Sequence, residues 1–217
     1  SKFVVESIKA GKTVYVEKPL ALNFSELDEI DKAIVEHNGR VMLGFNRRFS
    51  KPFLDMKRFA IQYKSPKNML YRVNAGYIPK GHWVQRPEQG GRIIGEVCHF
   101  IDCMVFLTDA LPETVYCNSL SVADYEMKNR DNISLTIKFT DGSLGTILYM
   151  SNGDKSVPKE YCEMHCNGTS AIMNDFRTVE FHRASKTWTN KYDGRKGHKE
   201  EIFATIEAMK KGDDMPI

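Results

Sequence analysis

The sequence predicts an α+β protein in which the end of a doubly wound α/β unit precedes a large, mostly antiparallel sheet flanked by a few helices. Residues 1–46 alternate helix-type and strand-type patterns, as the chains of parallel sheets do. From about residue 66 the pattern changes to long extended segments, and Asp141-Gly142 between two of them is a strong hairpin signal. We therefore expect two structural units, with a boundary near residues 46–50.

The first unit contains two helix–strand pairs. In order, we expect a helix at residues 2–10, a strand at 13–16, a helix that ends at 38–39 and a strand at 40–45. Gly11 stands where the first helix would leave the right-handed region, and Asn23 with Glu26 forms an N-terminal capping pair for the second helix. This order of elements is typical of the closing part of a doubly wound parallel sheet.

The second unit is rich in strands. We expect strands at about 68–78, 113–122, 132–139, 143–151, 159–166, 170–174, 178–183 and 187–192, and helices at about 91–107 and 197–211. In the first of these helices an apolar stripe lies on one side, while Arg92, Glu96, His99 and Asp102 cluster on another. The order indicates an antiparallel or mixed sheet with few helices.

Composition excludes several classes of partner. Charged residues make up 27% of the 217 residues, nearly cancel at a net charge of +3 and are scattered, so a nucleic-acid partner is not expected. No apolar run reaches the ~20 residues that span a bilayer, and residues 1–16 lack the order of a secretory signal. We therefore expect a cytoplasmic protein without a membrane partner, whose five cysteines are free thiols.

A zinc site must be weighed, because Cys162, His165 and Cys166 lie close together in the sequence. If residues 159–166 form a strand, the two cysteines share one face but lie ~13 Å apart, and His165 points the other way. The spacing does not favour chelation, and no metal is expected.

Lys18 is the first candidate for chemistry. It follows a buried strand of the parallel type, and ligands of such folds bind beyond the carboxyl ends of the strands. An ammonium group held between Glu17 and Pro19 could meet the ribose of a cofactor and a substrate hydroxyl, and Pro19 stiffens the turn. The alternative is a solvated lysine at the end of a strand.

His99 is the second candidate. It lies in the middle of an expected helix, three residues from both Glu96 and Asp102, where a carboxylate could orient the imidazole and raise its basicity. A histidine of this kind can take a proton from a sugar hydroxyl. The alternative is a buried core histidine with satisfied hydrogen bonds.

Four further side chains could contact a substrate. Trp83, in the loop before that helix, could stack on a sugar ring or cover the core, and Arg92 near the helix start could contact an anion. Arg47 and Arg48 follow a strand end, where paired arginines bind phosphate or carboxylate, or serve as salt-bridge partners.

Taken together, three strings resemble one family, the Gfo/Idh/MocA oxidoreductases. Residues 10–21, which contain Glu17-Lys18-Pro19, resemble the family's Glu-Lys-Pro motif with its lead-in helix and strand. Residues 44–49 resemble the crossover from the Rossmann domain to the second domain, and residues 90–102 resemble the glycine-led active-site helix. The resemblance covers essentially the whole chain.

The resemblance implies a division into residues 1–46, the last part of a dinucleotide-binding Rossmann domain, and 47–217, a substrate-binding and oligomerisation domain. It also implies that the family's dinucleotide fingerprint lies upstream of Ser1 and that the chain by itself is inactive. One departure is notable: many members carry an aspartate four residues before the histidine, where this chain has Gly95 followed by Glu96. Members with this pattern resemble a subgroup acting on nucleotide-linked or acidic sugars, which puts inositol-like substrates in doubt.

In function, the resemblance implies hydride transfer between NAD or NADP and a hydroxyl-bearing carbon of a sugar or nucleotide-sugar. Lys18 and His99 are the expected catalytic residues. The expected cofactor contacts are Glu17, Lys18 and Pro19. The expected substrate contacts are Arg48, Trp83, Arg92, Glu96 and Asp102.

Two other functions stay open. The chain could be a non-catalytic dimerisation or ligand-binding module whose open sheet face pairs with a second copy, since strand residues such as Ile133, Leu135, Ile137, Ile147 and Tyr149 could form that face. It could also be a member that has kept the fold and lost the reaction. We expect a homo-oligomer that forms through the open face of the sheet.

Overall fold

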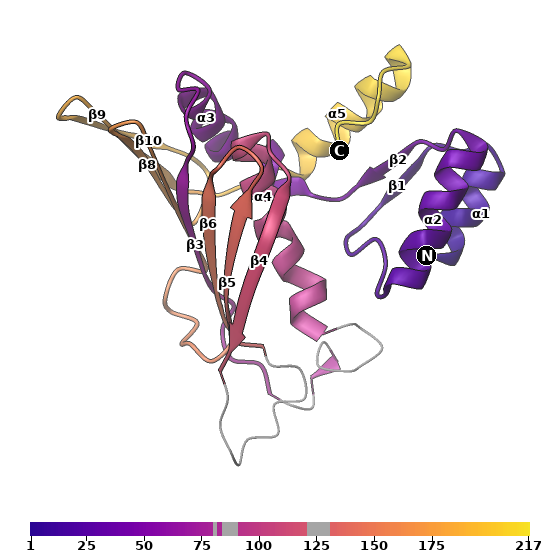
Figure 1. The fold of residues 1–217 in the computed structure, drawn as a ribbon, viewed down its shortest axis with the longest axis horizontal. Coiled ribbons are helices and arrows are strands. Elements are labelled where there is room, and N and C mark those ends of the chain that lie inside the picture. Colours follow the sequence, from indigo (N-terminus) through magenta and orange to yellow (C-terminus); the bar gives the residue numbers. More distant parts are fainter. Residues whose placement is uncertain (80–81, 84–90, 121–130) are drawn as a thin grey trace.

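The computed structural model describes residues 1–79, 82–83, 91–120 and 131–217. These residues form two sheets (Figure 1): a small parallel pair, and an eight-stranded sheet in the order β10-β9-β8-β7-β3-β6-β5-β4. The small sheet lies between the two N-terminal helices and the C-terminal helix, apart from the large sheet (Figure 1). Among the described residues no helix is long and apolar enough to cross a membrane.

The elements have the following bounds. The helical elements are α1 (Lys2–Lys9), α2 (Phe24–His37), the 3₁₀ turn η1 (Asn46–Phe49), α3 (Lys51–Ala60), the π-helical turn η4 (Ile93–Val97), α4 (Cys98–Thr108) and α5 (His198–Lys211). The small sheet contains β1 (Val14–Val16) and β2 (Val41–Leu43). The large sheet contains β3 (Asn68–Asn74), β4 (Pro112–Ser119), β5 (Ile133–Phe139), β6 (Leu144–Met150), β7 (Glu160–Cys166), β8 (Thr169–Asn174), β9 (Thr178–Arg183) and β10 (Lys186–Lys191).

Local sequence signals explain the first unit. The side chain of Asn23 accepts a hydrogen bond from the Glu26 backbone N–H at 2.9 Å, which caps the start of α2. Asn38 ends that helix in the left-handed region, with φ of 49°. The helices bury a small apolar cluster against β1 and β2, with Ile8 and Ile30 at its centre. The expected helix–strand–helix–strand order is confirmed.

The large sheet is mixed, as expected. Strand β3 pairs antiparallel with β7 on one side and parallel with β6 on the other, and the remaining neighbours pair antiparallel. The hairpin between β5 and β6 turns at Asp141-Gly142, where Asp141 Oδ1 accepts a hydrogen bond from the Ser143 backbone N–H at 2.9 Å. The predicted fold class is therefore confirmed.

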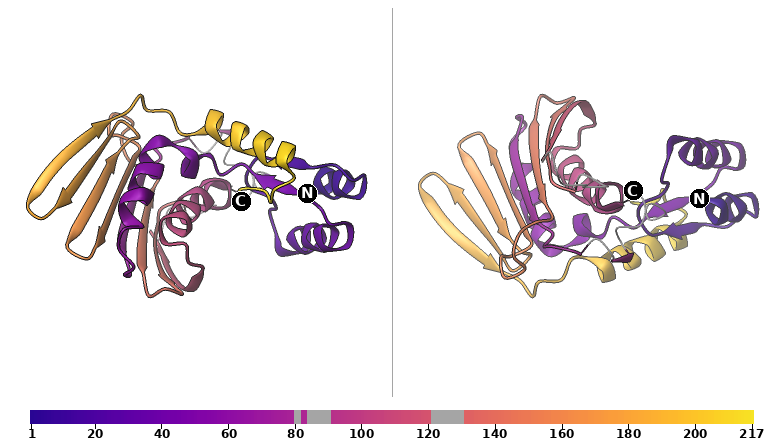
Figure 2. Two further views of the ribbon diagram at one scale, coloured as in Figure 1. Left: turned by 90° about the horizontal axis from the view of Figure 1, so that it is seen from above. Right: turned by 90° about the horizontal axis from the view of Figure 1, so that it is seen from below.

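Helices α3 and α4 cover one face of the large sheet (Figure 2). The rings of Phe53 and Phe100 pack against Tyr71 of β3, with centroid distances of 6.1 Å and 4.8 Å. The opposite face carries exposed side chains such as Ser134, Thr136 and Lys138. This contact pattern places the main core between the helices and the sheet.

The side chains that were expected on the open face of the large sheet lie on its covered face. Leu135, Ile137, Ile147 and Tyr149 are buried on the helix-covered face, and Ile133 packs against the same core. Their alternation was identified correctly, but a period of two does not say which face a helix covers. The open face consists of the residues between them.

Two helical features differ from expectation. Helix α3 was not anticipated, although Ser50 caps its first turn and Pro52 lies near its start, both ordinary helix-start signals. The expected helix at 91–107 begins as the π-helical turn η4 before it becomes α4. A π turn inserts one residue into the helix and shifts the direction of the side chains around it.

Helix α5 returns to the first unit (Figure 2). The Tyr15 hydroxyl of β1 donates a 2.9 Å hydrogen bond to Glu201, and Arg40 donates one of 3.2 Å to the Ala208 carbonyl. At the start of α5, Gly197 has a φ of 90°, and a side chain there would lie 2.6 Å from the Ser50 backbone nitrogen. The last helix therefore packs tightly against the crossover and against β1.

Candidate functional site

Lys18 and His99, distant in the sequence, come together in the fold. The Lys18 ammonium donates a 2.5 Å hydrogen bond to the Gly95 carbonyl, across 77 positions of the chain. Gly95 lies four residues before His99, a spacing that places both on one side of a helix. Lys18 also acts electrostatically on His99. The end of β1 thus meets the helix that carries the histidine.

His99 is held as a neutral imidazole. It is 4% exposed and meets Phe45 edge-on, with ring centroids 5.8 Å apart. Burial, followed by the positive charges of Arg47 and Lys18, lowers the pKa of His99 to about 2. Its Nδ1 atom is buried and has no hydrogen-bond partner among the described residues. The imidazole is therefore unprotonated near neutral pH, with a nitrogen that can accept a hydrogen bond.

The expected carboxylate partners do not reach this histidine. Glu96 accepts a 2.6 Å hydrogen bond from the Tyr149 hydroxyl and pairs with Lys159. Asp102 accepts two hydrogen bonds from Arg48, one of them of 3.0 Å. The prediction that a carboxylate raises the basicity of His99 was wrong. Glu96 lies in the π turn, which changes the direction of its side chains relative to a regular α-helix. Asp102 is bound by the planar guanidinium of Arg48, which donates to both of its carboxylate oxygens.

Two predicted substrate contacts, Arg48 and Arg92, have protein partners. The Arg48 side chain is 15% exposed, pairs with Asp102 and stacks over Phe106 at 5.6 Å. Arg92 is buried and donates hydrogen bonds to the Tyr149 hydroxyl at 3.0 Å and to the carbonyls of Gly76 and Ala75 at 3.1 Å each. The contacts of Arg92 join the start of the helix that carries His99 to the ends of β3 and β6.

Trp83 is placed differently from the two arginines. It is 58% exposed, and its ring lies 5.7 Å from that of His82. Residues 84–90, the rest of the loop that was singled out, lie outside the described part of the chain. Trp83 is therefore largely exposed among the described residues and does not cover the core.

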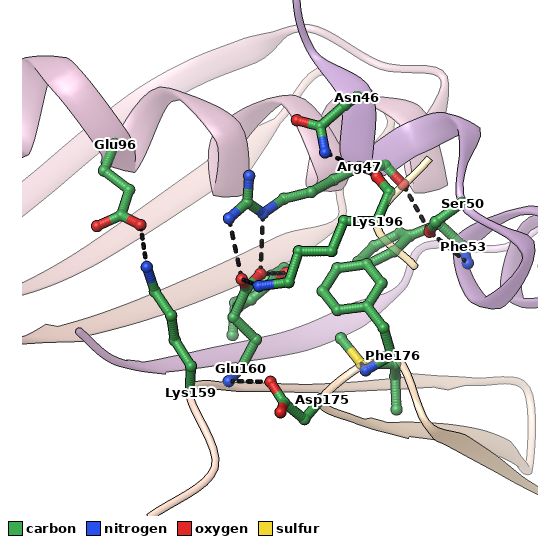
Figure 3. Close-up of polar contacts among 12 residues, drawn as sticks. Asn46, Arg47, Ser50, Phe53, Glu96, Lys159, Glu160, Asp175, Phe176 and Lys196 are labelled. Carbon is green, nitrogen blue, oxygen red and sulfur yellow. Dashed lines mark hydrogen bonds and ion pairs between the residues drawn. The ribbon is translucent and has the colours of Figure 1, made fainter. Parts of the chain in front are cut away.

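Sequence reasoning missed a buried charged cluster around Glu160 (Figure 3). Its carboxylate accepts two hydrogen bonds of 2.9 Å from Arg47, one of 2.7 Å from the Tyr71 hydroxyl and one of 2.6 Å from Lys196. Burial opposes ionisation of Glu160, but the charges of Arg47 and Lys196 outweigh it and lower its pKa to about 2. Arg47 was considered for a salt bridge, yet nothing in the sequence identified its partner.

A second carboxyl group, that of Glu201 beside β1, has a raised pKa, in contrast to the lowered pKa of Glu160. Glu201 is fully buried, and burial, followed by the charges of Glu17 and Asp102, raises its pKa to about 7, against the effect of the hydrogen bond from Tyr15. Its Oε1 atom is buried without a hydrogen-bond partner among the described residues. The two buried carboxyl groups thus differ: Glu160 is ionised at neutral pH, whereas Glu201 holds its proton up to about pH 7.

The residues expected to hold the cofactor lie at the carboxyl end of β1. Glu17 is exposed, and Lys18 and Pro19 are half-buried. A carboxylate suits ribose hydroxyls and an ammonium group suits a partly negative oxygen, so this donor set fits the ribose–nicotinamide end of a dinucleotide. The buried, unpartnered Nδ1 of His99 nearby shows that the site has hydrogen-bonding capacity to spare.

Strand β7 carries Cys162, His165 and Cys166, the three residues that were weighed as a zinc site. Cys162 and Cys166 are buried on one face, and His165 lies on the exposed face, where its Nδ1 is 2.8 Å from the Ser170 hydroxyl. The strand and the alternation that were predicted for this segment are confirmed.

Comparison with known proteins defines the class of the molecule. Residues 61–171 match the family model of the GFO/IDH/MocA C-terminal domain, which is a domain of oxidoreductases. The chain belongs to the Gfo/Idh/MocA family, and the predicted family is confirmed.

Some curated relatives are named as inositol dehydrogenases. The inositol 2-dehydrogenase/D-chiro-inositol 3-dehydrogenase of Halalkalibacterium halodurans is 43% identical over 195 residues, which cover 86% of this chain and 53% of that protein. The myo-inositol 2-dehydrogenase of Thermotoga maritima is 24% identical over 150 residues, or 68% of this chain and 45% of that protein. The chain thus spans about half the length of these curated relatives.

Solved structures share the fold. UDP-N-acetylglucosamine 3-dehydrogenase from Acidithiobacillus ferrooxidans superposes with a TM-score of 0.80 at 17% identity, over 99% of this chain and 67% of that one. A putative NADPH-dependent oxidoreductase from Desulfitobacterium hafniense gives a TM-score of 0.81 at 17% identity, over 100% and 68%. At these identities the likeness concerns the fold alone.

Proposed function

We propose that the protein is an NAD- or NADP-dependent dehydrogenase that oxidises a hydroxyl-bearing carbon of a sugar, nucleotide-sugar or cyclitol, or reduces the corresponding ketone. The observation that carries the proposal is the convergence of the Lys18 ammonium on the turn that precedes the neutral His99. Membership of an oxidoreductase family and the names of the inositol and nucleotide-sugar dehydrogenases among its relatives support it.

The chemistry follows from the two side chains. A nicotinamide held by Glu17, Lys18 and Pro19 would supply the acceptor for the hydride that leaves the substrate carbon. His99, whose Nδ1 has no hydrogen-bond partner among the described residues, takes the hydroxyl proton as the hydride leaves the same carbon. Lys18 stabilises the negative charge that develops on the substrate oxygen and fixes the position of that oxygen. In the reverse direction the same imidazole returns the proton.

The other predicted residues take different parts in this proposal. Glu17, Lys18 and Pro19 hold the nicotinamide ribose. Trp83, which is exposed, and Glu96, whose side chain is 20% exposed, contact the substrate. Arg48, Asp102 and Arg92, already bound to protein groups, position the active-site helix. The division into residues 1–46 and 47–217 belongs to the same proposal.

The test is a turnover assay of the full-length protein. Reduced nicotinamide is followed by its absorbance with myo-inositol, UDP-glucose and UDP-N-acetylglucosamine, each with NAD and with NADP. His99→Ala should lower kcat by about a hundredfold or more. His182→Ala, on strand β9 next to the edge strand β10, is the matched control and should keep the wild-type rate. Unchanged turnover in His99→Ala would remove the histidine from the mechanism.

A second proposal concerns assembly. The face of the large sheet opposite α3 and α4 exposes Ser134, Thr136 and Lys138 and leaves Leu70 and Leu148 only half-buried. We propose that a second copy covers this face. Light scattering of Leu70→Lys and Leu148→Lys variants should show a shift from dimer to monomer, because a buried lysine at an interface is costly. A wild-type monomer at micromolar concentration would contradict this proposal.

A further inference from the structure

The Tyr15 hydroxyl lies between two carboxyl groups from different parts of the fold. Its oxygen is 2.9 Å from Glu201 Oε2, in the first turn of α5, and 3.5 Å from Glu17 Oε1, just after β1. Burial, followed by the hydrogen bond to Glu201 and the charges of Glu201 and Glu17, raises the pKa of Tyr15, so the hydroxyl keeps its proton. A phenolic hydroxyl has one proton to donate, and it can serve only one of the two carboxyl groups at a time.

The protonation state of Glu201 selects which group receives that proton. Glu201 is wholly buried, and its Oε1 has no hydrogen-bond partner among the described residues, a costly setting for an ionised carboxylate. The side chains that act on it electrostatically are also acidic: Glu17 and Asp102 of α4, the latter paired with Arg48 of η1. A protonated carboxyl group donates its hydrogen to the Tyr15 oxygen and frees the Tyr15 proton for Glu17, whereas an ionised one accepts that proton itself.

Glu17 is the exposed member of this set. Its second carboxylate oxygen lies against Gly44, where an added Cβ would be 2.9 Å from Oε2. A hydrogen bond from Tyr15 to Oε1 fixes the carboxylate on its other side, and lone pairs remain on both oxygens for the hydroxyls of a ribose. Holding a binding group in place before the ligand arrives increases affinity, because less freedom is lost on binding.

We propose that Tyr15 and Glu201 are positioning residues for Glu17: Tyr15 donates to Glu17 while Glu201 is protonated and turns to Glu201 once that group ionises, so the hold on the cofactor ribose weakens as pH rises. This inference rests on the proposed function, in which Glu17 contacts the nicotinamide ribose, and adds a control of cofactor affinity by pH. The change falls near neutral pH, because the pKa of Glu201 is about 7.

The experiment measures cofactor binding and needs no turnover. Binding of NADH and of NADPH to the full-length protein is followed by nicotinamide fluorescence at about pH 6 and about pH 8.5, on either side of the Glu201 titration. The wild-type Kd should be about three- to tenfold higher at the alkaline pH, the range that one net hydrogen bond is worth. Glu207→Gln, an exposed acid on the same helix, is the matched control and should keep the wild-type ratio.

Two variants should move the Kd in opposite directions. Glu201→Gln offers Tyr15 an amide N–H in place of the carboxyl O–H and cannot ionise, so its Kd should stay at the low wild-type value at both pH values. Tyr15→Phe removes the donor, so its Kd should be high at both. A role confined to stability would move both variants the same way, and the melting temperature of each variant shows that it is folded.

The outcomes distinguish the inference from the proposed function. A wild-type Kd that is equal at both pH values overturns the inference alone. So does a pH dependence that persists in either variant, and each variant decides the question without the other. A wild type that binds neither dinucleotide overturns the proposed function and the inference together.

Discussion

Arg47 and Glu160 lie 113 positions apart in the sequence and form two hydrogen bonds of 2.9 Å each in the interior of the protein. Arg47 belongs to the crossover η1 and Glu160 begins β7, so the pair fixes the crossover to the large sheet. The Arg47 guanidinium also lies 5.3 Å from the centre of the Phe100 ring, beside His99. A contact that stabilises the fold thus also shapes the electrostatic surroundings of the proposed base.

Glu160→Gln should destabilise the protein. The substitution leaves the buried Arg47 charge without a countercharge, and breaking a buried pair in this way costs about 3–5 kcal/mol. Urea unfolding provides the measurement. Asp193→Asn, which removes the exposed partner of Arg195, is the matched control and should change the free energy of unfolding by less than about 1 kcal/mol. Equal effects of the two variants would contradict the structural importance of the buried cluster.

Glu201 should make stability fall as pH rises. Its pKa is raised from 4.5 to about 7 in the folded protein, so the folded state holds a proton that the unfolded state has lost between these values. The free energy of unfolding should therefore decrease by about 2–3 kcal/mol from pH 4.5 to pH 8 because of this group. Glu201→Gln should remove this decrease, as measured by urea unfolding at several pH values.

The control for this pH effect lies on the same helix. Glu207 is exposed and pairs with Lys210, so Glu207→Gln should retain the wild-type pH dependence. If Glu201→Gln and the wild type showed parallel pH profiles, the buried carboxyl group would not be the source of the effect.

Lys18→Met should lower kcat by about a hundredfold or more and leave the melting temperature within a few degrees of the wild-type value. Lys18 is half-buried and contributes one hydrogen bond to the fold, whereas the proposed function assigns its charge to the oxygen of the transition state. Lys12→Met, on the exposed segment just before β1, is the control and should keep full activity. A normal rate in Lys18→Met would exclude the lysine from catalysis.

Arg48 and Asp102 should behave as a coupled pair in a double-mutant cycle. Arg48→Met and Asp102→Leu should each destabilise the protein by about 2–4 kcal/mol, and the double variant should lose at least about 1 kcal/mol less than the sum. The expected reason is that each single change leaves one buried charge unpaired. Additive effects would show that the two side chains act independently, as separate substrate contacts would.

Much of the fold could be predicted because its signals are local. The cap at Asn23 and the turn at Asp141-Gly142 identified their elements from a few neighbouring residues. Helix α3 was missed although it has equally local start signals, because its ten residues follow the crossover directly and form a short pattern. The faces of the large sheet were confused because alternation alone does not locate the covering helices.

The site was predictable only in part, for a different reason. Lys18 and His99 were identified by the short strings around them, and the structure brings these strings together. The partners of Glu160 lie 113, 89 and 36 positions away from it, so no local pattern could reveal the cluster. Glu96, the partner of Lys159, lies in the π turn η4, which contains one residue more than a regular α-helical turn. The spacing of apolar residues in the sequence does not reveal this extra residue.

The return of α5 to the side of β1 means that the backbone passes between the two units twice, once before α3 and once before α5 (Figure 1). Cleavage of either connection by a protease would leave the units attached through the other one. Contacts such as that between Asn46 and the Lys196 carbonyl, 2.7 Å apart, also tie the two connections to each other. A nicked molecule should for this reason still migrate as one particle under native conditions and separate only when unfolded.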